Sequence, residues 1–298
     1  MTVFPPRRFY RVTLPSGRVL ALGERCLVMG ILNVTPDSFG DASRFVHAGS
    51  VDVERAVQAG LDLEAAGADL LDVGGESTRP GADPVSAHEE TSRVVPVIKA
   101  LASRVRVPIS VDTYKAVVAR AALGAGAVMV NDISGLQYDS ELAAVVRAGG
   151  AALVLMHTRG RSQAMYEEAV YTDVMTEVVA ELRDAVTRAT SAGVPMDRLL
   201  VDPGIGFAKR PSHSYGVLAR LGEISTALDR PVLAGPSRKS FLLETVGLRP
   251  APDRDWGTAA AVTAAVLVGA HIVRVHAVAE MIQVVRVAEE TRRAGGAT

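Results

Sequence analysis

Residues 28–41 of the chain read VMGILNVTPDSFGD, and this stretch decides how the rest of the sequence is interpreted. It begins with an apolar run from Val28 to Leu32, which is typical of a buried strand. It turns polar at Asn33 without passing through a helix, and Pro36 prevents a helix or a strand ladder from continuing. A buried strand that ends in amide, hydroxyl and carboxylate groups is how α/β proteins present a functional site. The alternative is a strand followed by a solvated turn, and one such stretch does not decide between the two.

Further apolar runs of the same kind alternate with amphipathic stretches along the chain. Strands are predicted at residues 28–34, 70–74, 109–113, 129–133, 152–157, 199–204, 232–237 and 272–276. Helices are predicted at residues 53–66, 88–103, 115–123, 175–192 and 281–292. This alternation over roughly 250 residues predicts an α/β fold, the (β/α)8 TIM barrel. An open doubly wound sheet is the rival fold, but no G-x-G-x-x-G follows the first strand and no Walker motif is present.

The segments outside this alternation have their own interpretation. Residues 9–23 predict a hairpin with its turn at Pro15-Ser16-Gly17, which covers one end of the fold. We therefore predict one domain over residues 1–298, with residues 1–25 as a hairpin extension. The gaps at 35–51, 77–86 and 158–171 are long for barrel loops, and loops of this length are typical of lids and binding loops.

Composition narrows the class of protein. The net charge is −1 and the basic and acidic residues interleave, which argues against a nucleic-acid partner and permits a small anionic ligand. Cys26 is the single cysteine, so a reducing, cytoplasmic compartment is predicted. The N-terminus lacks the apolar core of a signal peptide. The longest uncharged run, residues 256–273, is interpreted as a buried Ala-rich helix that enters a strand, not as a membrane span.

Polar side chains gather at the carboxyl ends of the predicted strands, which meet at one mouth of a barrel. They are Asn33, Asp72, Asp112, Asn131, Asp132, His157, Asp202, Ser237, Arg238, Lys239, Arg274 and His276, together with the turn at residues 74–79, and the apolar Met156 stands beside His157. Asp132, Ser134 and Thr113 fit capping of the following helices. The others stand in otherwise apolar runs, and buried charges of this kind require partners or a ligand.

The residue types at the first and last strands suit an oxyanion and a divalent metal ion. Arg274 and His276 alternate along the last strand and therefore face the same way. With Asn33 and Asp37 they could hold phosphate oxygens and Mg²⁺, which prefers hard oxygen ligands. A zinc site that uses His157 and His276 is the weaker alternative, because the first strand ends in Asn-Val-Thr instead of an H-x-H pair.

A second group of residues suits a heterocycle. Asp112, Asn131 and Asp202 are carboxylates and an amide among apolar neighbours, which can accept hydrogen bonds from adjacent ring N–H donors. Lys239, one of only four lysines in the chain, follows a Gly-Pro-Ser-Arg loop that could bring its ammonium group over that ring.

Eight segments together resemble the dihydropteroate synthase family of pterin-binding barrel enzymes. They are GILNVTPDSF, DVGGESTRPGA, SVDTYK, VNDISG, LVLMH, DPGIGFAK, GPSRKSF and RVH, in the family's order between residues 30 and 276. The resemblance implies condensation of 6-hydroxymethyl-7,8-dihydropterin diphosphate with 4-aminobenzoate, which gives 7,8-dihydropteroate and pyrophosphate. It also implies an SN1-like substitution assisted by Mg²⁺, competition by sulfonamides, and a homodimer.

The resemblance also implies roles for individual residues. Asn33 would bind Mg²⁺ and the diphosphate with Asp37 nearby, Arg79, Arg274 and His276 would hold the diphosphate, and Thr78 would lie beside the pterin diphosphate. The pterin would be held by Asp112, Asn131, Met156, Asp202 and Lys239. The aminobenzoate pocket would be lined by Phe39, Pro80, Phe207 and Ser240. Asp41 would approach the reacting carbon, so the expected catalytic residues are Asp41, Lys239, Arg274 and His276.

The chain departs from the family pattern at three places. The first loop reads SFGDAS instead of SFSDGG, Ala277 replaces an aspartate after His276, and LMHTRG lacks a second methionine after its histidine. Two alternatives share the pterin-holding residues: a methyltransferase that acts on methyltetrahydrofolate and a corrinoid protein, and a non-catalytic pterin-binding barrel. Arg79, Lys239 and Arg274 favour the synthase, because a methyl transfer needs no diphosphate site.

Overall fold

The computed structural model describes residues 4–35, 46–47, 50–79, 81–161 and 166–296. Within these residues, parallel strands form a sheet in the order β10-β9-β8-β7-β6-β3-β12-β11. The strands are β3 (Leu27–Asn33), β6 (Leu70–Gly74), β7 (Ile109–Asp112), β8 (Met129–Asp132), β9 (Ala152–Met156), β10 (Leu199–Asp202), β11 (Leu233–Ala234) and β12 (Ile272–Val275). A parallel bridge between Val201 and Val232 closes the ring from β10 to β11. The predicted TIM barrel is therefore confirmed.

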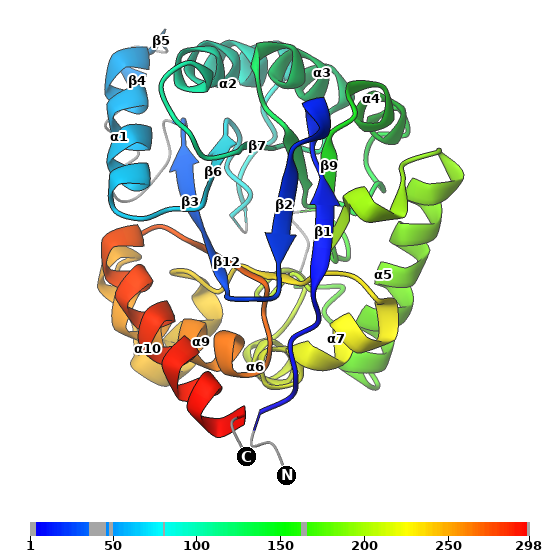
Figure 1. Cartoon of the computed structure of the whole chain (residues 1–298), viewed down its shortest axis with the longest axis vertical. Coiled ribbons are helices and arrows are strands. Elements are labelled where there is room, and N and C mark those ends of the chain that lie inside the picture. The colour runs from blue at the N-terminus through cyan, green and yellow to red at the C-terminus, as the bar shows by residue number, and fades with distance from the viewer. Residues whose placement is uncertain (1–3, 36–45, 48–49, 80, 162–165, 297–298) are drawn as a thin grey trace.

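Helices surround the barrel, as Figure 1 shows. They are α1 (Val53–Ala65), α2 (Ala87–Ala102), α3 (Ala116–Ala125), α4 (Leu142–Gly149), α5 (Val174–Ser191), α6 (Pro211–Ala219), α7 (Leu221–Leu228), α8 (Leu243–Val246), α9 (Asp255–Leu267) and α10 (Val278–Gly296). Asp52, Ser86 and Asp173 begin α1, α2 and α5 by accepting hydrogen bonds from backbone N–H groups of the first turn. None of the helices within the described residues combines the length and apolar character that a membrane span needs.

Two predicted strands are shorter than expected by two residues or more, whereas several others end one residue early. The strand predicted at 199–204 ends at Asp202, and the one predicted at 232–237 covers only Leu233–Ala234. Proline explains both differences, because Pro203 and Pro236 have no backbone N–H to donate to a neighbouring strand. Each shortened strand leaves an irregular turn at the same end of the barrel, and those turns carry polar residues of the site.

The N-terminal segment forms the predicted hairpin. Strands β1 (Tyr10–Thr13) and β2 (Val19–Leu22) pair antiparallel and flank a 3-10 turn at Pro15–Gly17. Val12, Leu14 and Leu22 pack against apolar side chains of the barrel interior, among them Met29 and Met129. In Figure 1 the hairpin lies on the viewer's side, in front of the middle of the ring of helices. The hairpin therefore covers one end of the barrel, and the other end is left for the site. Strands β4 (Val46–His47) and β5 (Ser50–Val51) also pair antiparallel.

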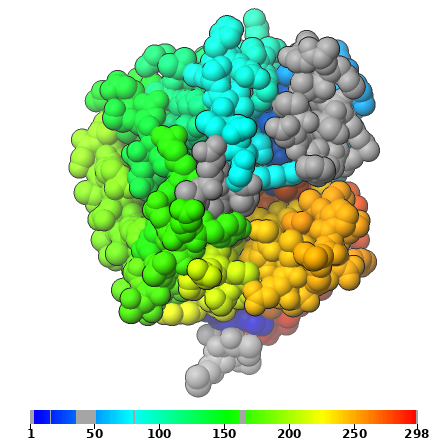
Figure 2. Space-filling view, turned by 180° about the vertical axis from the view of Figure 1, so that it is seen from behind, coloured from blue at the N-terminus to red at the C-terminus, as the bar shows by residue number. Residues whose placement is uncertain are grey.

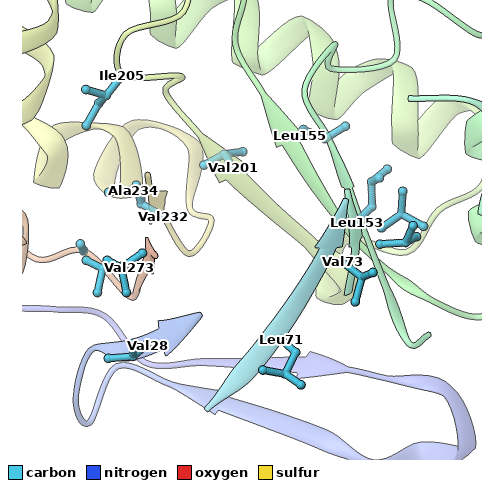
Figure 3. Close-up of a cluster of buried hydrophobic side chains, with 14 of the residues drawn as sticks. Val28, Leu71, Val73, Leu153, Leu155, Val201, Ile205, Val232, Ala234 and Val273 are labelled. Carbon is cyan, nitrogen blue, oxygen red and sulfur yellow. The ribbon is translucent and has the colours of Figure 1, made fainter. Parts of the chain in front are cut away.

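The larger core lies between the strands and the surrounding helices. Figure 3 shows side chains of this cluster from β3, β6, β9, β10, β11 and β12. Leu71, Leu153 and Val201 are fully buried there. Because parallel strands are covered on both faces, their sequences are almost continuously apolar, and this made them recognisable in the sequence.

Core packing in this cluster can be tested at Leu153. Replacement of the fully buried Leu153 by Ala removes methyl groups and leaves a cavity that the surrounding helices can fill only in part. We expect this change to lower the free energy of unfolding by about 2–5 kcal/mol. Val117→Ala on α3 is the control, because Val117 is 58% exposed and should change stability by about 0.5 kcal/mol or less. Urea denaturation followed by circular dichroism measures both. Equal losses in the two variants would contradict the assigned core.

Candidate active site

Residues at or next to the carboxyl ends of four neighbouring strands form one row across the sheet. Asn33 pairs in register with Gly74, Gly74 with Asp112, and Asp112 with Asn131. A Cβ atom on Gly74 would lie 3.3 Å from Asn33 Oδ1 and 3.5 Å from Asp112 Cβ. Contacts of this length are tight, so glycine leaves the space in which the two polar side chains approach each other. The register therefore brings together an amide and a carboxylate that lie far apart in the sequence.

Arg274 connects β12 to two carboxylates on other strands. Its Nε donates to Asp72 Oδ2 at 2.6 Å and its Nη2 donates to Asp112 Oδ2 at 2.7 Å. Asn131 Nδ2 donates to the same oxygen of Asp72 at 2.9 Å. Burial raises the pKa of Asp112 to about 7, although Arg274 opposes the shift. Asp72 was assigned no role from the sequence. The structure shows that it is fully buried and accepts hydrogen bonds from both Arg274 and Asn131.

Asp202 and Lys239 face the same region from the two shortened strands. Asp202 Oδ2 and Lys239 Nζ both lie within 4.0 Å of the position that a Cβ atom on Gly235 would occupy. Burial raises the pKa of Asp202, and Lys239 opposes this shift. Burial lowers the pKa of Lys239 to about 8, and Asp202 opposes that shift in turn. The Lys239 ammonium lies 4.3 Å from the ring centroid of Phe207, which is within cation–π range.

His276 is oriented by a hydroxyl group. Ser237 Oγ accepts from the His276 backbone N–H at 3.2 Å and lies 2.9 Å from His276 Nδ1. Since this hydroxyl accepts from the backbone, its own proton is available for Nδ1, which leaves the imidazole proton on Nε2. Burial, together with the cations Arg238 and Arg274, holds the pKa of His276 well below its usual value. Ser237 thus orients the imidazole in a chain that has Ala277 where an aspartate was expected.

A cavity of about 990 Å³ opens above these groups. The residues predicted for the site that line it are Asn33, Thr78, Arg79, Asp112, Phe207, Lys239, Ser240, Arg274 and His276. Asn131, Met156 and Asp202 are nearly fully buried at the strand ends. Arg254 also lines the cavity, and burial lowers its pKa, with Arg79 contributing in the same direction. No motif or strand end pointed to Arg254, which lies in a short 3-10 helix (Pro252–Arg254) before α9.

Figure 2 shows the face opposite to that of Figure 1, where three distant parts of the chain converge. Segments near residues 75–85, near 166–170 and near 235–255 border the same central region, in cyan, green and orange. Four predicted residues, Asp37, Phe39, Asp41 and Pro80, lie outside the described residues. The structure therefore places the pterin and diphosphate candidates together and leaves the first-loop candidates unplaced.

The two histidines considered for zinc have other partners. His157 Nε2 lies 3.0 Å from Glu181 Oε2, and its Nδ1 lies 2.8 Å from Lys209 Nζ. His276 contacts Ser237. Across the described ranges, no group of three or more His, Cys, Asp or Glu side chains is placed to hold a metal ion. The hard oxygen donor that lines the cavity at the first strand is the Asn33 amide, which suits Mg²⁺ better than zinc.

The prediction that Asp132, Ser134 and Thr113 cap the following helices is wrong, because neither α3 nor α4 has a side-chain hydrogen bond at its N-cap. These side chains hold the turns that precede the helices instead. Asp132 accepts hydrogen bonds from the backbone N–H groups of Ser134 and Leu136 and from Ser134 Oγ. Thr113 Oγ1 accepts from the backbone N–H of Lys115 at 3.2 Å. These side chains stabilise the turns after β7 and β8 and are separate from the cavity lining.

Residues 29–276 match the family described as pterin binding enzyme. Dihydropteroate synthase of Synechocystis is 42% identical over 287 residues, which is 96% of this chain and 95% of that protein. Dihydropteroate synthase of Escherichia coli K12 is 44% identical over 264 residues, which is 89% of this chain and 91% of that protein.

Solved structures give the same result. A Yersinia pestis dihydropteroate synthase in a sulfonamide drug complex has a TM-score of 0.88 at 39% identity and covers 95% of this chain and 99% of that one. A Xanthomonas albilineans dihydropteroate synthase with 4-aminobenzoic acid has a TM-score of 0.85 at 41% identity and covers 96% of this chain and 99% of that one. The barrel, the order of the motifs and these similarities agree, and the chain belongs to the pterin-binding enzyme family, in its dihydropteroate synthase group.

Proposed function

We propose that this site condenses 6-hydroxymethyl-7,8-dihydropterin diphosphate with 4-aminobenzoate to form 7,8-dihydropteroate and pyrophosphate. The observation that best supports this is that the site is negatively charged at the strands and positively charged along the cavity wall. Asp72 and Asp202 are buried within β6 and at the end of β10, and Asp112 ends β7 with 11% of its side chain exposed. Cationic side chains line the cavity that opens above these carboxylates. A ligand that presents N–H donors at one end and an anion at the other matches this arrangement.

The pterin ring would bind at the carboxylate end. Asp112 and Asp202 would accept hydrogen bonds from the ring N–H groups, and Asn131 can both donate and accept. Met156 is nearly fully buried and would supply an apolar contact. Lys239, which already lies against the Phe207 ring, would place its ammonium beside the pterin. Asp112, Asn131, Asp202 and Lys239 are expected here from residue type, and Met156 from the resemblance to the family.

The diphosphate would bind at the cationic wall. Arg79, Arg274 and the Nε2–H of His276 would donate to phosphate oxygens, with Thr78 beside them. Mg²⁺ would be held by the Asn33 amide oxygen, since Mg²⁺ commonly takes few protein ligands and completes its shell with substrate phosphates and water. When bound there it would neutralise charge on the leaving diphosphate.

The chemistry follows from this placement of charge. The bond between the pterin methylene carbon and the diphosphate oxygen would break with its electron pair on the oxygen, where Arg79 and Arg274 stabilise the charge. The pterin ring would delocalise the resulting cation. The neutral amine of 4-aminobenzoate would then form the C–N bond and lose a proton, so no strong base is required. Exclusion of water would favour capture by the amine.

The aminobenzoate would occupy the part of the cavity near Phe207 and Ser240. Phe39 and Pro80 stay predicted members of this pocket and Asp41 stays predicted to approach the reacting carbon, since all three lie outside the described residues. The Yersinia pestis relative forms a complex with a sulfonamide drug, and the same class of compound would compete with aminobenzoate here. A homodimer and a cytoplasmic location stay predictions. Sedimentation of the purified chain and imaging of a tagged copy would test them.

The activity test is pyrophosphate release from the pterin diphosphate, measured with and without 4-aminobenzoate and with and without Mg²⁺. We expect dihydropteroate to form only when both are present, because the leaving group needs charge neutralisation and the cation needs a nucleophile. Pterin binding without any release would contradict the synthase. It would favour the corrinoid methyltransferase, if methyltetrahydrofolate reacts, or else a non-catalytic pterin-binding barrel.

Arg274→Lys tests the central cation of the site. Lysine keeps the charge but lacks the planar fork that reaches both Asp72 and Asp112, so we expect kcat/KM to fall about a hundredfold or more. Arg286→Lys on the exposed face of α10 is the matched control and should retain full activity. Thermal denaturation shows whether each variant is folded. Wild-type kcat/KM in a folded Arg274→Lys protein would remove Arg274 from the mechanism.

The binding of pterin should depend on pH through Asp112. Its pKa of about 7 means that the carboxyl is increasingly protonated below pH 7 in the free protein, whereas the bound pterin needs the carboxylate. We expect pterin affinity to fall by up to about tenfold per pH unit below pH 7, with proton release on binding. Calorimetry in buffers of different ionisation enthalpy measures both quantities. Asp112→Asn should bind more weakly and show a flat profile, and a flat profile in the wild type would contradict the assignment.

A further inference from the structure

A buried lysine outside the proposed chemistry lies directly behind the aminobenzoate side of the cavity. Lys209 is 1% exposed, and its Nζ donates to the backbone carbonyl of Phe207 at 3.1 Å. The same nitrogen lies 2.8 Å from His157 Nδ1. Burial of an ammonium group is unfavourable unless its partners are well placed, so the identity of these partners indicates what the lysine does.

The partner network fixes the imidazole of His157 in one tautomer. Glu181 Oε2 lies 3.0 Å from His157 Nε2, and Arg159 Nε donates to Glu181 Oε1 at 3.0 Å. Burial and the neighbouring Lys209 lower the pKa of His157 to about 4, so the ring is neutral near pH 7. A neutral ring has one N–H, and the carboxylate accepts it from Nε2. Nδ1 is therefore an acceptor for Lys209, and the network runs from α5 through the end of β9 to the turn after β10.

The turn that Lys209 holds is strained and carries a wall of the cavity. Ala208 has φ of +46°, a left-handed conformation that disfavours any residue with a Cβ atom by about 1–3 kcal/mol. Lys209 holds the carbonyl before this residue, and Tyr171 Oη donates to the carbonyl of Ala208 itself at 2.9 Å. The ring of the preceding residue, Phe207, lines the cavity under Lys239.

We propose that Lys209, oriented by His157 and Glu181, is a positioning residue that fixes the Phe207 ring in the aminobenzoate part of the cavity. It acts through the Phe207 carbonyl and touches no substrate. This inference rests on the proposed function, because it concerns the second substrate of that reaction. It assigns a role to the histidine-containing segment LMHTRG, where the chain departs from the family pattern, and to the lysine that ends DPGIGFAK.

The test compares the two substrates in Lys209→Met, which keeps the length of the side chain and removes the donor. We expect KM for 4-aminobenzoate to rise about tenfold, equivalent to about 1.4 kcal/mol, while KM for the pterin diphosphate stays within about twofold. Arg7→Met is the matched control, since Arg7 is also a buried cation but contacts Val266 and Glu289, which do not line the cavity. Arg7→Met should change neither KM, whatever it does to stability.

A second comparison separates positioning from a general loss of structure. If Lys209 acts through Phe207, then Lys209→Met should add almost nothing to the KM of a Phe207→Ala protein, because coupled residues are not additive. Glu181→Gln, at the outer end of the network, should raise the same KM by about threefold, and it carries the test if Lys209→Met does not fold. An equal rise in both KM values, or full additivity with Phe207→Ala, would overturn the proposal.

Nitrogen NMR of the His157 ring tests the network independently of turnover. We expect Nε2 to be protonated and Nδ1 unprotonated from pH 5.5 to 8, in accordance with the pKa of about 4. A ring protonated on Nδ1, or one that titrates near its ordinary pKa of about 6.5, would overturn the network. If the wild-type chain made no dihydropteroate, the proposed function would fail while the NMR result still decided whether His157 is held as described.

Discussion

The guanidinium of Arg274, placed between two buried carboxylates, is the interaction on which the site depends. Asp72 lies on β6, Asp112 on β7 and Arg274 on β12, so the ion pairs cross the barrel instead of following its hydrogen-bonded order. Burial of two carboxylates without a cation would be strongly unfavourable. The barrel can hold its pterin-binding carboxylates because its last strand supplies the opposite charge. The same guanidinium faces the cavity, so it is also available to an anionic ligand.

The strand register made much of this site predictable. Apolar runs with polar ends revealed the strands, and a barrel brings such ends to one mouth, so Asn33, Asp112 and Arg274 were expected together. The partner of each group was not predictable. Arg274 and Asp72 are 202 residues apart, and neither spacing nor composition indicates that they pair. Ser237 likewise orients His276 from 39 residues away, a contact that depends on how β11 ends.

His157 shows why residue type alone was insufficient. A histidine at a strand end, close to a presumed cavity, has the same sequence signal whether it binds a ligand, a metal ion or other side chains. The structure distinguishes these possibilities because both ring nitrogens have partners, Lys209 and Glu181, and the ring is nearly fully buried. The sequence signal that came closest was the rarity of lysine, since Arg supplies most of the positive charge and a lysine within a motif is therefore informative.

Two of the four non-glycine residues with left-handed φ among the described residues stand next to residues of the site. Ala208 has a left-handed φ of +46° and directly follows the cavity residue Phe207. Arg238 has a left-handed φ of +58° and directly precedes the cavity residue Lys239. Side chains hold both conformations: Tyr171 donates to the Ala208 carbonyl, and Arg238 forms two hydrogen bonds with Asp255 at 2.7 Å. Strained residues persist only when their surroundings determine them. The contact between the Lys239 ammonium and the Phe207 ring is thus set from two sides by groups that take no part in the chemistry. Substitutions at these supporting groups should therefore change substrate discrimination before they change the fold.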